Sequence, residues 1–104
     1  MSIAAKREVV SIRAKNDVFR QALLGQVFLT RLVEKSPIKD KILEAVKNFR
    51  DFNRGNDPWG EHDFAFFEVG RNTWFFKIDY YDDDYKYFKK DGNRVITIGH
   101  RSDY

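Results

Sequence analysis

Residues that could do chemistry are concentrated in the second half of the chain. Glu61, His62 and Asp63 are adjacent, and Asp79 and Asp82 follow further along. Carboxylates and an imidazole can bind Mg²⁺, Mn²⁺ or Zn²⁺, and a bound metal ion can activate water for phosphodiester hydrolysis. The candidate divalent-metal ligands are therefore Glu61, Asp63, Asp79 and Asp82. In the alternative, structural interpretation, these side chains cap loops, pair with basic residues and close the edge of the core, and no cofactor is bound.

A run of tyrosines and acids forms a second candidate site. Tyr80, Tyr81, Asp82, Asp83 and Tyr85 lie close together in the sequence. Tyrosine supplies contact area at a small entropic cost, and carboxylates suit a basic partner. We therefore expect these five residues to form a docking surface for another protein. The alternative is a solvated turn with one or two rings packed beneath it.

Charge is distributed unevenly along the chain. The net charge is +3, but residues 1–50 carry +6 (11 Lys and Arg, 5 Asp and Glu) and residues 51–104 carry −3 (8 and 11). A basic half can bind nucleic acid or an acidic protein. The candidate nucleic-acid-binding residues are Arg13, Lys15, Arg20, Lys35 and Lys39. No RNP motif, helix-turn-helix signature or zinc ligand set is present, so a solvated pair of helices is the alternative.

Composition limits the class of protein. The 104 residues have the size of one domain, and no linker or repeat divides residues 1–104. The chain has no cysteine, which removes disulfides and thiol nucleophiles and favours a cytoplasmic protein. No stretch has the apolar length of a signal peptide or a membrane helix, so no membrane partner is expected. Without a nucleophile elbow or a glycine-rich phosphate loop, a protein that is not an enzyme is favoured.

Two helices are predicted in the first half of the chain. Apolar residues at helical spacing predict a helix over residues 6–24, ended by Gly25 at its C′ position. Ser36 as N-cap and Pro37 as first helical residue predict a second helix that ends near Phe52.

Four strands are predicted from runs of β-branched and aromatic residues. They span residues 26–32, 62–69, 73–81 and 93–99. A three-residue loop, from Gly70 to Asn72, joins the second and third strands. The order α-β-α-β-β-β predicts an α+β fold, with two helices packed on a four-stranded, mostly antiparallel sheet.

The loop length also predicts the register of this hairpin. A three-residue loop pairs Val69 with Thr73 and places Asp63 directly opposite Asp79. Two facing carboxylates cost stability unless a cation bridges them, which strengthens the metal hypothesis.

The same register predicts which rings are buried. Phe64 and Phe66 would share a face with Phe76 and meet the helices. The opposite face would carry Phe67 and Phe75, which a second copy of the chain could cover in a homodimer.

Several segments of the sequence resemble a known family. They are Asn16-Asp17-x-Phe19-Arg20, NDPWGEHDF from Asn56 to Phe64, KIDYYD from Lys77 to Asp82, RVITI from Arg94 to Ile98, and the terminal Asp103-Tyr104. Together they are similar to the bacterial family called domain of unknown function 3768, from about Ile12 to Tyr104. The resemblance implies a small bacterial protein of a kind often carried on plasmids and other mobile elements. It implies no established reaction.

These observations favour a small binding protein without catalytic activity. Small size, the absence of a catalytic motif, two oppositely charged halves and the implied mobile-element context predict an inhibitor of bacterial defence, of the anti-CRISPR or anti-restriction type, which a plasmid or phage would carry. Its partner would be a host protein or nucleoprotein. One alternative is a small metal-dependent nuclease or RNA-cleaving toxin. Another is a nucleic-acid-binding module that uses the basic N-terminal half.

Overall fold

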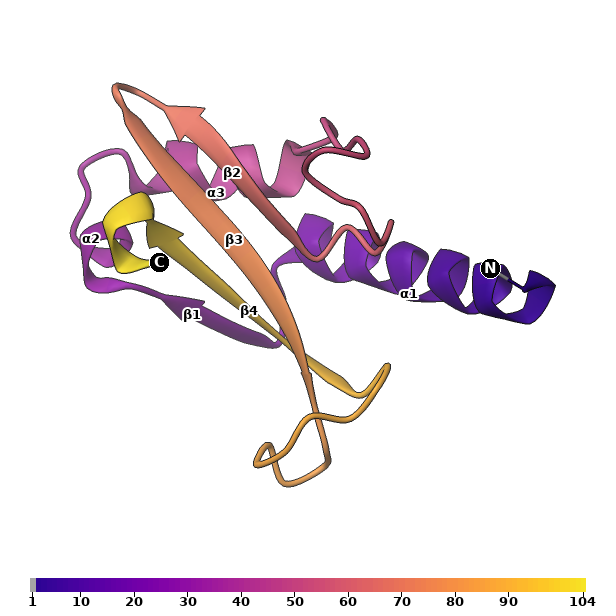
Figure 1. Cartoon of the computed structure of the whole chain (residues 1–104). Helices are drawn as coiled ribbons and strands as arrows, with labels where there is room; N and C mark the ends of the chain where they lie inside the picture. Colours follow the sequence, from indigo (N-terminus) through magenta and orange to yellow (C-terminus); the bar gives the residue numbers. More distant parts are fainter. Residues whose placement is uncertain (1) are drawn as a thin grey trace.

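Helices cover one face of a four-stranded sheet in the computed structural model, which describes residues 2–104 (Figure 1). The elements in this range are α1 (Ile3–Ala22), β1 (Gln26–Leu29), α2 (Arg31–Glu34), α3 (Lys39–Asn48), β2 (Phe64–Val69), β3 (Asn72–Tyr81), β4 (Asn93–His100) and the 3₁₀ turn η1 (Arg101–Asp103). The predicted α+β class is confirmed. The described residues form three α-helices rather than two, because the short α2 begins where a strand was predicted to continue.

The sheet is mixed and has the strand order β1-β4-β3-β2 (Figure 1). β3 pairs antiparallel with β2 and with β4, whereas β1 pairs parallel with β4. The expectation of a mostly antiparallel sheet therefore fails for one pair. β1 is parallel to β4 because the chain leaves it through helices and returns to its side only after a long crossover.

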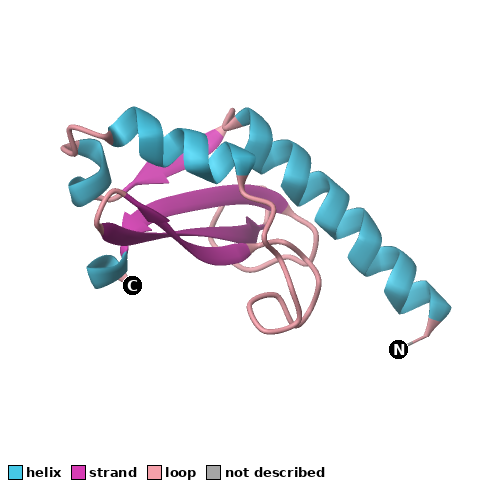
Figure 2. Cartoon of the chain, turned by 90° about the horizontal axis from the view of Figure 1, so that it is seen from above, coloured by secondary structure: helices cyan, strands magenta, loops and turns pink. Residues whose placement is uncertain are grey.

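α1 is longer than predicted and ends earlier. Its end is set by Leu23, which takes a left-handed conformation (φ 48°) and donates its N–H to the Phe19 carbonyl. Gly25, predicted as the C′ residue, lies beyond this cap. Ile12 is buried, but Val10 is 54% exposed, because the first turns of α1 extend past the sheet (Figure 2).

The segment after α1 divides differently from the prediction. β1 ends at Leu29, and Thr30 then begins α2 while its N–H donates to the Ile98 carbonyl (2.9 Å). The Ser36 hydroxyl accepts a hydrogen bond from the Ile38 N–H (3.2 Å), so Ser36 stabilises a turn before α3 and does not cap it. α3 also ends several residues before the predicted position.

The β2–β3 hairpin differs from the prediction by one residue. A two-residue turn, Gly70-Arg71, joins the strands, and Val69 pairs with Asn72 instead of Thr73. Gly70 has a φ of 66°, which a type II′ turn requires at its first central position and which glycine adopts without strain. The predicted three-residue loop is wrong, and the one-residue shift exchanges the two faces of β2.

The shift changes which rings lie on each face of the sheet. Phe67 is 8% exposed and packs in the core, whereas Phe66 is 43% exposed and lies opposite Phe75 on the outer face. The ring of Tyr104 packs on this outer face, with its centroid 5.1 Å from that of Phe64 and 5.3 Å from that of Phe75. Phe66, not Phe67, is therefore the outward partner of Phe75.

The core lies between the helices and the inner face of the sheet. Its most deeply buried apolar residues include Ile12, Val33, Ile42, Val46, Phe76, Ile96 and Ile98. Two polar residues of α1, Asn16 and Arg20, are buried beside them. Buried polar groups need partners, so these two residues lead to the polar centre of the molecule.

Candidate functional site

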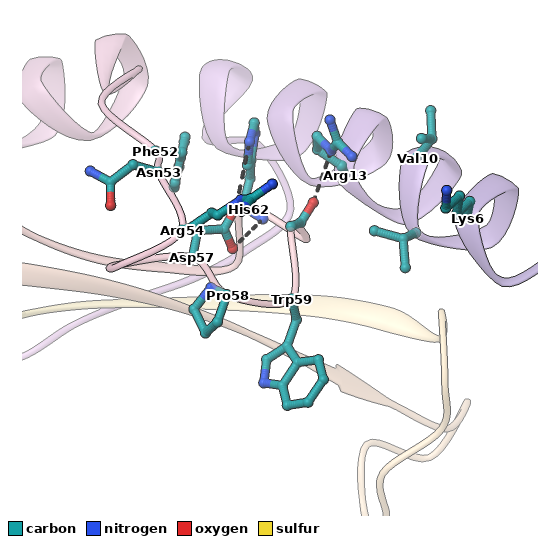
Figure 3. Close-up of a pocket in the computed structure, with 12 residues that line it drawn as sticks. Lys6, Val10, Arg13, Phe52, Asn53, Arg54, Asp57, Pro58, Trp59 and His62 are labelled. Carbon is teal, nitrogen blue, oxygen red and sulfur yellow. Dashed lines mark hydrogen bonds and ion pairs between the residues drawn. The ribbon is translucent and has the colours of Figure 1, made fainter. Parts of the chain in front are cut away.

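Polar residues from α1 and from the loop before β2 form a cluster that we call the polar network (Asn16, Asp17, Arg20, Asp57 and His62). The His62 Nδ1 atom lies 2.9 Å from Asp17 Oδ1. Its Nε2 atom lies 3.6 Å from Asp57 Oδ2, and both His62 and Asp57 are labelled in Figure 3. The backbone N–H of His62 donates to Asp57 Oδ1 (3.3 Å). A carboxylate therefore faces each ring nitrogen, and neither nitrogen is left free to take a proton from a substrate.

The backbone of His62 is held in an uncommon conformation. Its φ of 57° is left-handed, which a histidine adopts at some cost. Its ring stacks on that of Phe52, with the centroids 3.9 Å apart. The stack and the two carboxylates offset the cost, so His62 holds the loop before β2 against α1.

Arg20 joins α1 to the end of α3. It is 1% exposed, and its Nη1 atom donates to the carbonyls of Val46 (2.8 Å) and Phe49 (2.9 Å). Its Nη2 atom donates to Asp17 (3.0 Å). Burial lowers the pKa of Arg20, and the hydrogen bond to Asp17 opposes this change. Because the last carbonyls of a helix lack intrahelical partners, Arg20 acts as a cap for α3 and is not available to bind nucleic acid.

Asn16 links α1 to two strands, and both ends of its side-chain amide have partners. Its Nδ2 atom donates to the Tyr80 hydroxyl (2.7 Å) and to the Glu61 carbonyl (2.9 Å), and its Oδ1 atom accepts from Arg94 Nε (2.6 Å). Burial raises the pKa of Tyr80 to about 12, and the hydrogen bond with Asn16 opposes this change. Tyr80 is 8% exposed, so it belongs to the core and not to the predicted docking surface.

Other acids line a hollow of about 460 Å³ beside the C-terminal end of β3, which we call the acidic hollow (Glu61, Asp63, Asp79, Tyr81 and Phe88). Burial raises the pKa of Glu61 and the pKa of Asp63, and the charges of neighbouring carboxylates raise both further. Within residues 2–104, neither of these two carboxylates has a cation at ion-pair distance. The hollow therefore contains carboxylates that lack a direct ion-pair partner, and the more distant charges of Lys90 and Arg94 offset that of Glu61 only in part.

The position of Asp63 in this hollow differs from the prediction. The Ile78 N–H donates to the Asp63 carbonyl (2.7 Å), so Asp63 lies opposite Ile78 and not opposite Asp79. The predicted facing pair is wrong because the turn has two residues instead of three. Asp79 still contributes to the raised pKa of Asp63, and Lys77 Nζ lies 3.5 Å from Asp79.

The loop between β3 and β4 forms one wall of the acidic hollow and is fixed by ion pairs. Lys90 Nζ lies 3.0 Å from a carboxylate oxygen of Glu8 on α1. Asp91 accepts hydrogen bonds from Lys15 Nζ (2.7 Å) and Arg94 Nη2 (2.7 Å), and these bonds lower the pKa of Asp91. Lys90 is thus paired with Glu8, and Lys15 and Arg94 are paired with Asp91, while none of the three lies at ion-pair distance from Glu61 or Asp63.

The structure divides the predicted docking residues. Tyr80 lies in the core, and the Asp82 carboxylate accepts the Lys86 N–H (3.0 Å) and stabilises the turn after β3. Asp83 and Tyr85 are exposed, and the rings of Tyr81 and Tyr85 lie 6.4 Å apart. Three of the predicted residues, Tyr81, Asp83 and Tyr85, therefore reach the surface at one end of the molecule.

The predicted nucleic-acid-binding residues do not form one face. Lys15 and Lys39 are paired with carboxylates, Arg20 is buried, and Lys35 is exposed on a separate element. Arg13 lines a hollow beside α1. The basic half of the sequence therefore includes side chains with unrelated structural roles.

The predicted metal ligands are only partly brought together. Glu61, Asp63 and Asp79 line the acidic hollow, whereas Asp82 does not. Across residues 2–104, no three Asp, Glu or His side chains converge closely enough to hold a metal ion. The arrangement supplies negative charge without a coordination site.

A larger hollow of about 540 Å³ lies between α1 and the loop before β2 (Figure 3). We call it the basic hollow: Lys6 and Arg13 line it from α1, and Arg54 and Trp59 line it from the loop. Arg13 Nε donates to the Gly60 carbonyl (2.8 Å), and Trp59 is 75% exposed.

Lys6, Arg54 and Trp59 were missed by sequence reasoning. One available signal was Trp59 itself, because a large ring between a proline and a glycine in a turn-rich segment is hard to bury. The distance in sequence between Lys6 and Arg54 hides the fact that they line the same hollow.

The fold and its sites define a small α+β protein whose helices cover one face of a mixed sheet. Residues 28–103 match the family described as "Protein of unknown function (DUF3768)", and the chain belongs to this family. The resemblance seen in the motif segments is confirmed for these residues, while the segment from Asn16 to Arg20 precedes the match. No curated protein and no solved structure matches the chain.

The residues that match the family include the whole acidic hollow but only part of the basic hollow. All residues of the acidic hollow lie within residues 28–103, whereas Lys6 and Arg13 of the basic hollow precede them. Separately, no helix within residues 2–104 has both the length and the apolar character that crossing a membrane requires.

Proposed function

We propose that this protein binds a basic segment of a partner protein in the acidic hollow, and that it acts by binding and not by catalysis. The observation that carries the proposal is that Glu61 and Asp63 line one hollow and, within residues 2–104, have no cation at ion-pair distance. Burial and neighbouring acids also raise the pKa of both carboxyls. A lysine or arginine of a partner would offset this repulsion, so binding would relieve an unfavourable feature of the free protein.

Exposed rings of the loop between β3 and β4 extend the proposed contact surface, and one of them, Phe88, lines the hollow itself. Tyr87 and Phe88 are each 73% exposed, and Tyr85 is 45% exposed. Aromatic rings supply large contact areas and attract the cationic groups of arginine and lysine. Negative charge bordered by rings is complementary to a basic segment of mixed polar and apolar character.

The loop that frames the hollow is anchored to its neighbours, which favours binding. Lys90 and Asp91 anchor the loop to α1 through Glu8 and Lys15, and Arg94 anchors it to β4. A surface that is already ordered loses less conformational entropy when a partner binds.

The residues that line the acidic hollow support binding over catalysis. They include no serine, threonine, histidine or cysteine, and their one lysine, Lys90, is paired with Glu8. The lining therefore lacks the Ser-His, Cys-His or Thr-amine pairing of acyl transfer, and we assign its carboxylates the role of attracting a cation.

We further propose that the partner is a host defence protein or nucleoprotein, and that the chain inhibits it in the manner of an anti-CRISPR or anti-restriction protein. Proteins that bind nucleic acid carry basic surfaces for the phosphate backbone. An acidic hollow is complementary to such a surface and would compete with nucleic acid for it.

Affinity capture from a bacterial lysate tests this function with three forms of the chain. They are the wild type, the neutralised double variant Glu61→Gln/Asp63→Asn, and the control Glu44→Gln/Asp51→Asn, which makes the same change in charge at exposed acids elsewhere. We expect wild type and control to capture one stoichiometric partner, and the neutralised variant to lose it. A plasmid-interference assay with the same three forms should show protection that follows capture. Equal capture by all three forms, or no protection by any, would refute the proposal.

A further inference from the structure

We propose that the basic hollow binds single-stranded nucleic acid, with backbone phosphates on Lys6, Arg13 and Arg54 and a base stacked on Trp59. This site shares no lining residue with the acidic hollow and involves a different class of ligand, but the two adjoin, because Trp59 also lines a smaller hollow with Glu8 and Glu61. It also differs from the predicted set of basic residues, of which it contains only Arg13.

The cations of the basic hollow are free to contact phosphate. Within the described residues 2–104, Lys6, Arg13 and Arg54 have no carboxylate at ion-pair distance. Asp57 also lines the hollow, but it is held by the ring and the backbone N–H of His62. The charge that this wall presents is therefore mainly positive.

The cations come from two elements whose relative position is fixed. Arg13 Nε donates to the Gly60 carbonyl at 2.8 Å, which ties α1 to the loop and leaves the terminal nitrogens of Arg13 for another acceptor. Figure 3 shows Lys6 and Arg13 along α1 and Arg54 and Trp59 on the loop, where the exposed Trp59 indole extends away from α1. Phosphates of one strand could contact both elements because the cations face a common hollow.

The exposed indole points to a base and not only to a phosphate. Trp59 is 75% exposed, whereas Trp74 is 4% exposed in the core. Stacking of a base on an aromatic side chain is worth about 1–3 kcal/mol and suits unpaired bases, whose faces are accessible. An acidic peptide would satisfy the cations but would gain no comparable stacking, so the combination favours a single strand.

Trp59 also provides the experiment with its signal. Emission from an exposed indole should be quenched when an oligo-dT of about 12 nucleotides, within the usual range of single-strand sites, is titrated into the full chain. Binding should weaken as salt is raised. Anisotropy of a labelled oligonucleotide then measures variants, including Trp59→Ala, which lacks the signal.

The variants compare residues of the hollow with a matched residue outside it. We expect Trp59→Ala to weaken binding about tenfold through lost stacking, and Arg54→Ala to flatten the slope of log K against log salt by about 0.7 through one lost phosphate contact. Arg31→Ala removes an exposed arginine from α2 and should leave both quantities unchanged. The neutralised variant Glu61→Gln/Asp63→Asn should still bind the oligonucleotide, which separates this site from the acidic hollow.

Three results would overturn the inference. The first is an absence of quenching at low salt. The second is an equal loss of affinity in Arg31→Ala and Arg54→Ala, which would indicate attraction by net charge alone. The third is displacement of the strand by duplex DNA or by an oligo-glutamate peptide at the same charge concentration, which would leave no role for stacking.

Discussion

The polar network and the acidic hollow both contain carboxylates but differ in how the charges of those carboxylates are compensated. In the polar network, Asp17 contacts both Arg20 and His62, and Asp57 contacts His62. In the acidic hollow, burial raises the pKa of Glu61 and of Asp63, and so do neighbouring carboxylates, which are Asp63 and Asp57 for Glu61 and Asp57 and Asp79 for Asp63. The first arrangement holds α1, the loop and α3 together. The second costs stability, which is expected of a surface kept for a partner.

The largest expected effect is at the centre of the polar network. Replacing Arg20 by methionine keeps an apolar stem but leaves the carbonyls of Val46 and Phe49 without their donor. We expect the free energy of unfolding to fall by about 3 kcal/mol, as for other broken buried polar networks. Urea denaturation measures this change, and Arg50→Met, at an exposed position, is the control. Similar stability of the two variants would contradict a structural role for Arg20.

Two adjacent tyrosines sharpen the comparison. Tyr80→Phe removes the hydroxyl that Asn16 contacts in the core, and should lower the free energy of unfolding by about 1 kcal/mol. Tyr81→Phe changes a ring on the wall of the acidic hollow and should alter stability by less than about 0.5 kcal/mol. Chemical denaturation of the two variants provides the measurement. A larger loss of stability in Tyr81→Phe than in Tyr80→Phe would mean that Tyr81, and not Tyr80, faces the core.

Neutralising the acidic hollow should stabilise the free protein. A carboxyl whose pKa is raised in the folded state binds more protons when folded, so its contribution to stability falls as pH rises from its ordinary pKa through the raised one. We therefore expect Glu61→Gln/Asp63→Asn to raise the melting temperature at pH 7 by about 1–3 °C, the effect of relieving a modest like-charge repulsion. The difference from wild type should vanish below the ordinary pKa of a carboxyl, near pH 4. A lower melting temperature at pH 7 would show that these carboxylates are structural.

A similarly small effect is expected at Asp91, where the dependence on pH has the opposite sign. Its pKa is lowered by Lys15 and Arg94, so its contribution to stability is full above its ordinary pKa and is lost as pH falls through the lowered value. Asp91→Asn keeps a residue that tolerates the left-handed backbone at this position (φ 54°). It should cost about 0.5 kcal/mol at pH 7, as for partly exposed ion pairs, and less at high salt. A cost that did not respond to salt would argue against an electrostatic origin.

Local sequence signals predicted the elements better than their contacts. The three strands of the second half occur within a residue or two of their predicted positions, because alternating and aromatic residues specify a strand directly. Gly70 marked the turn correctly, but two-residue and three-residue loops are both compatible with Gly-Arg-Asn. The difference of one residue in the length of this loop decided which face of the sheet carries Phe66 and Phe67 and which residue lies opposite Asp63.

Long-range contacts explain the remaining misses. Arg20 looks like a surface cation in sequence, and only the approach of the end of α3 makes it a buried donor. The parallel pairing of β1 with β4 depends on a partner far along the chain. Among the site residues, Glu61 and Asp63 were predicted because acids stand out in sequence. Arg54 and Trp59 were not, because their relation to α1 exists only in the folded chain.

The overhang of α1 gives the protein an internal reporter. Ile12 is buried against the sheet, while the turns that precede it carry the exposed Ile3 and Val10. Amide hydrogens of those first turns should exchange with deuterated solvent much faster than those after Ile12, because they open without disturbing the core. A nucleic-acid strand bound in the basic hollow would contact Lys6 on this part of the helix. Slower hydrogen exchange of these amides would therefore report binding without a label or a substitution.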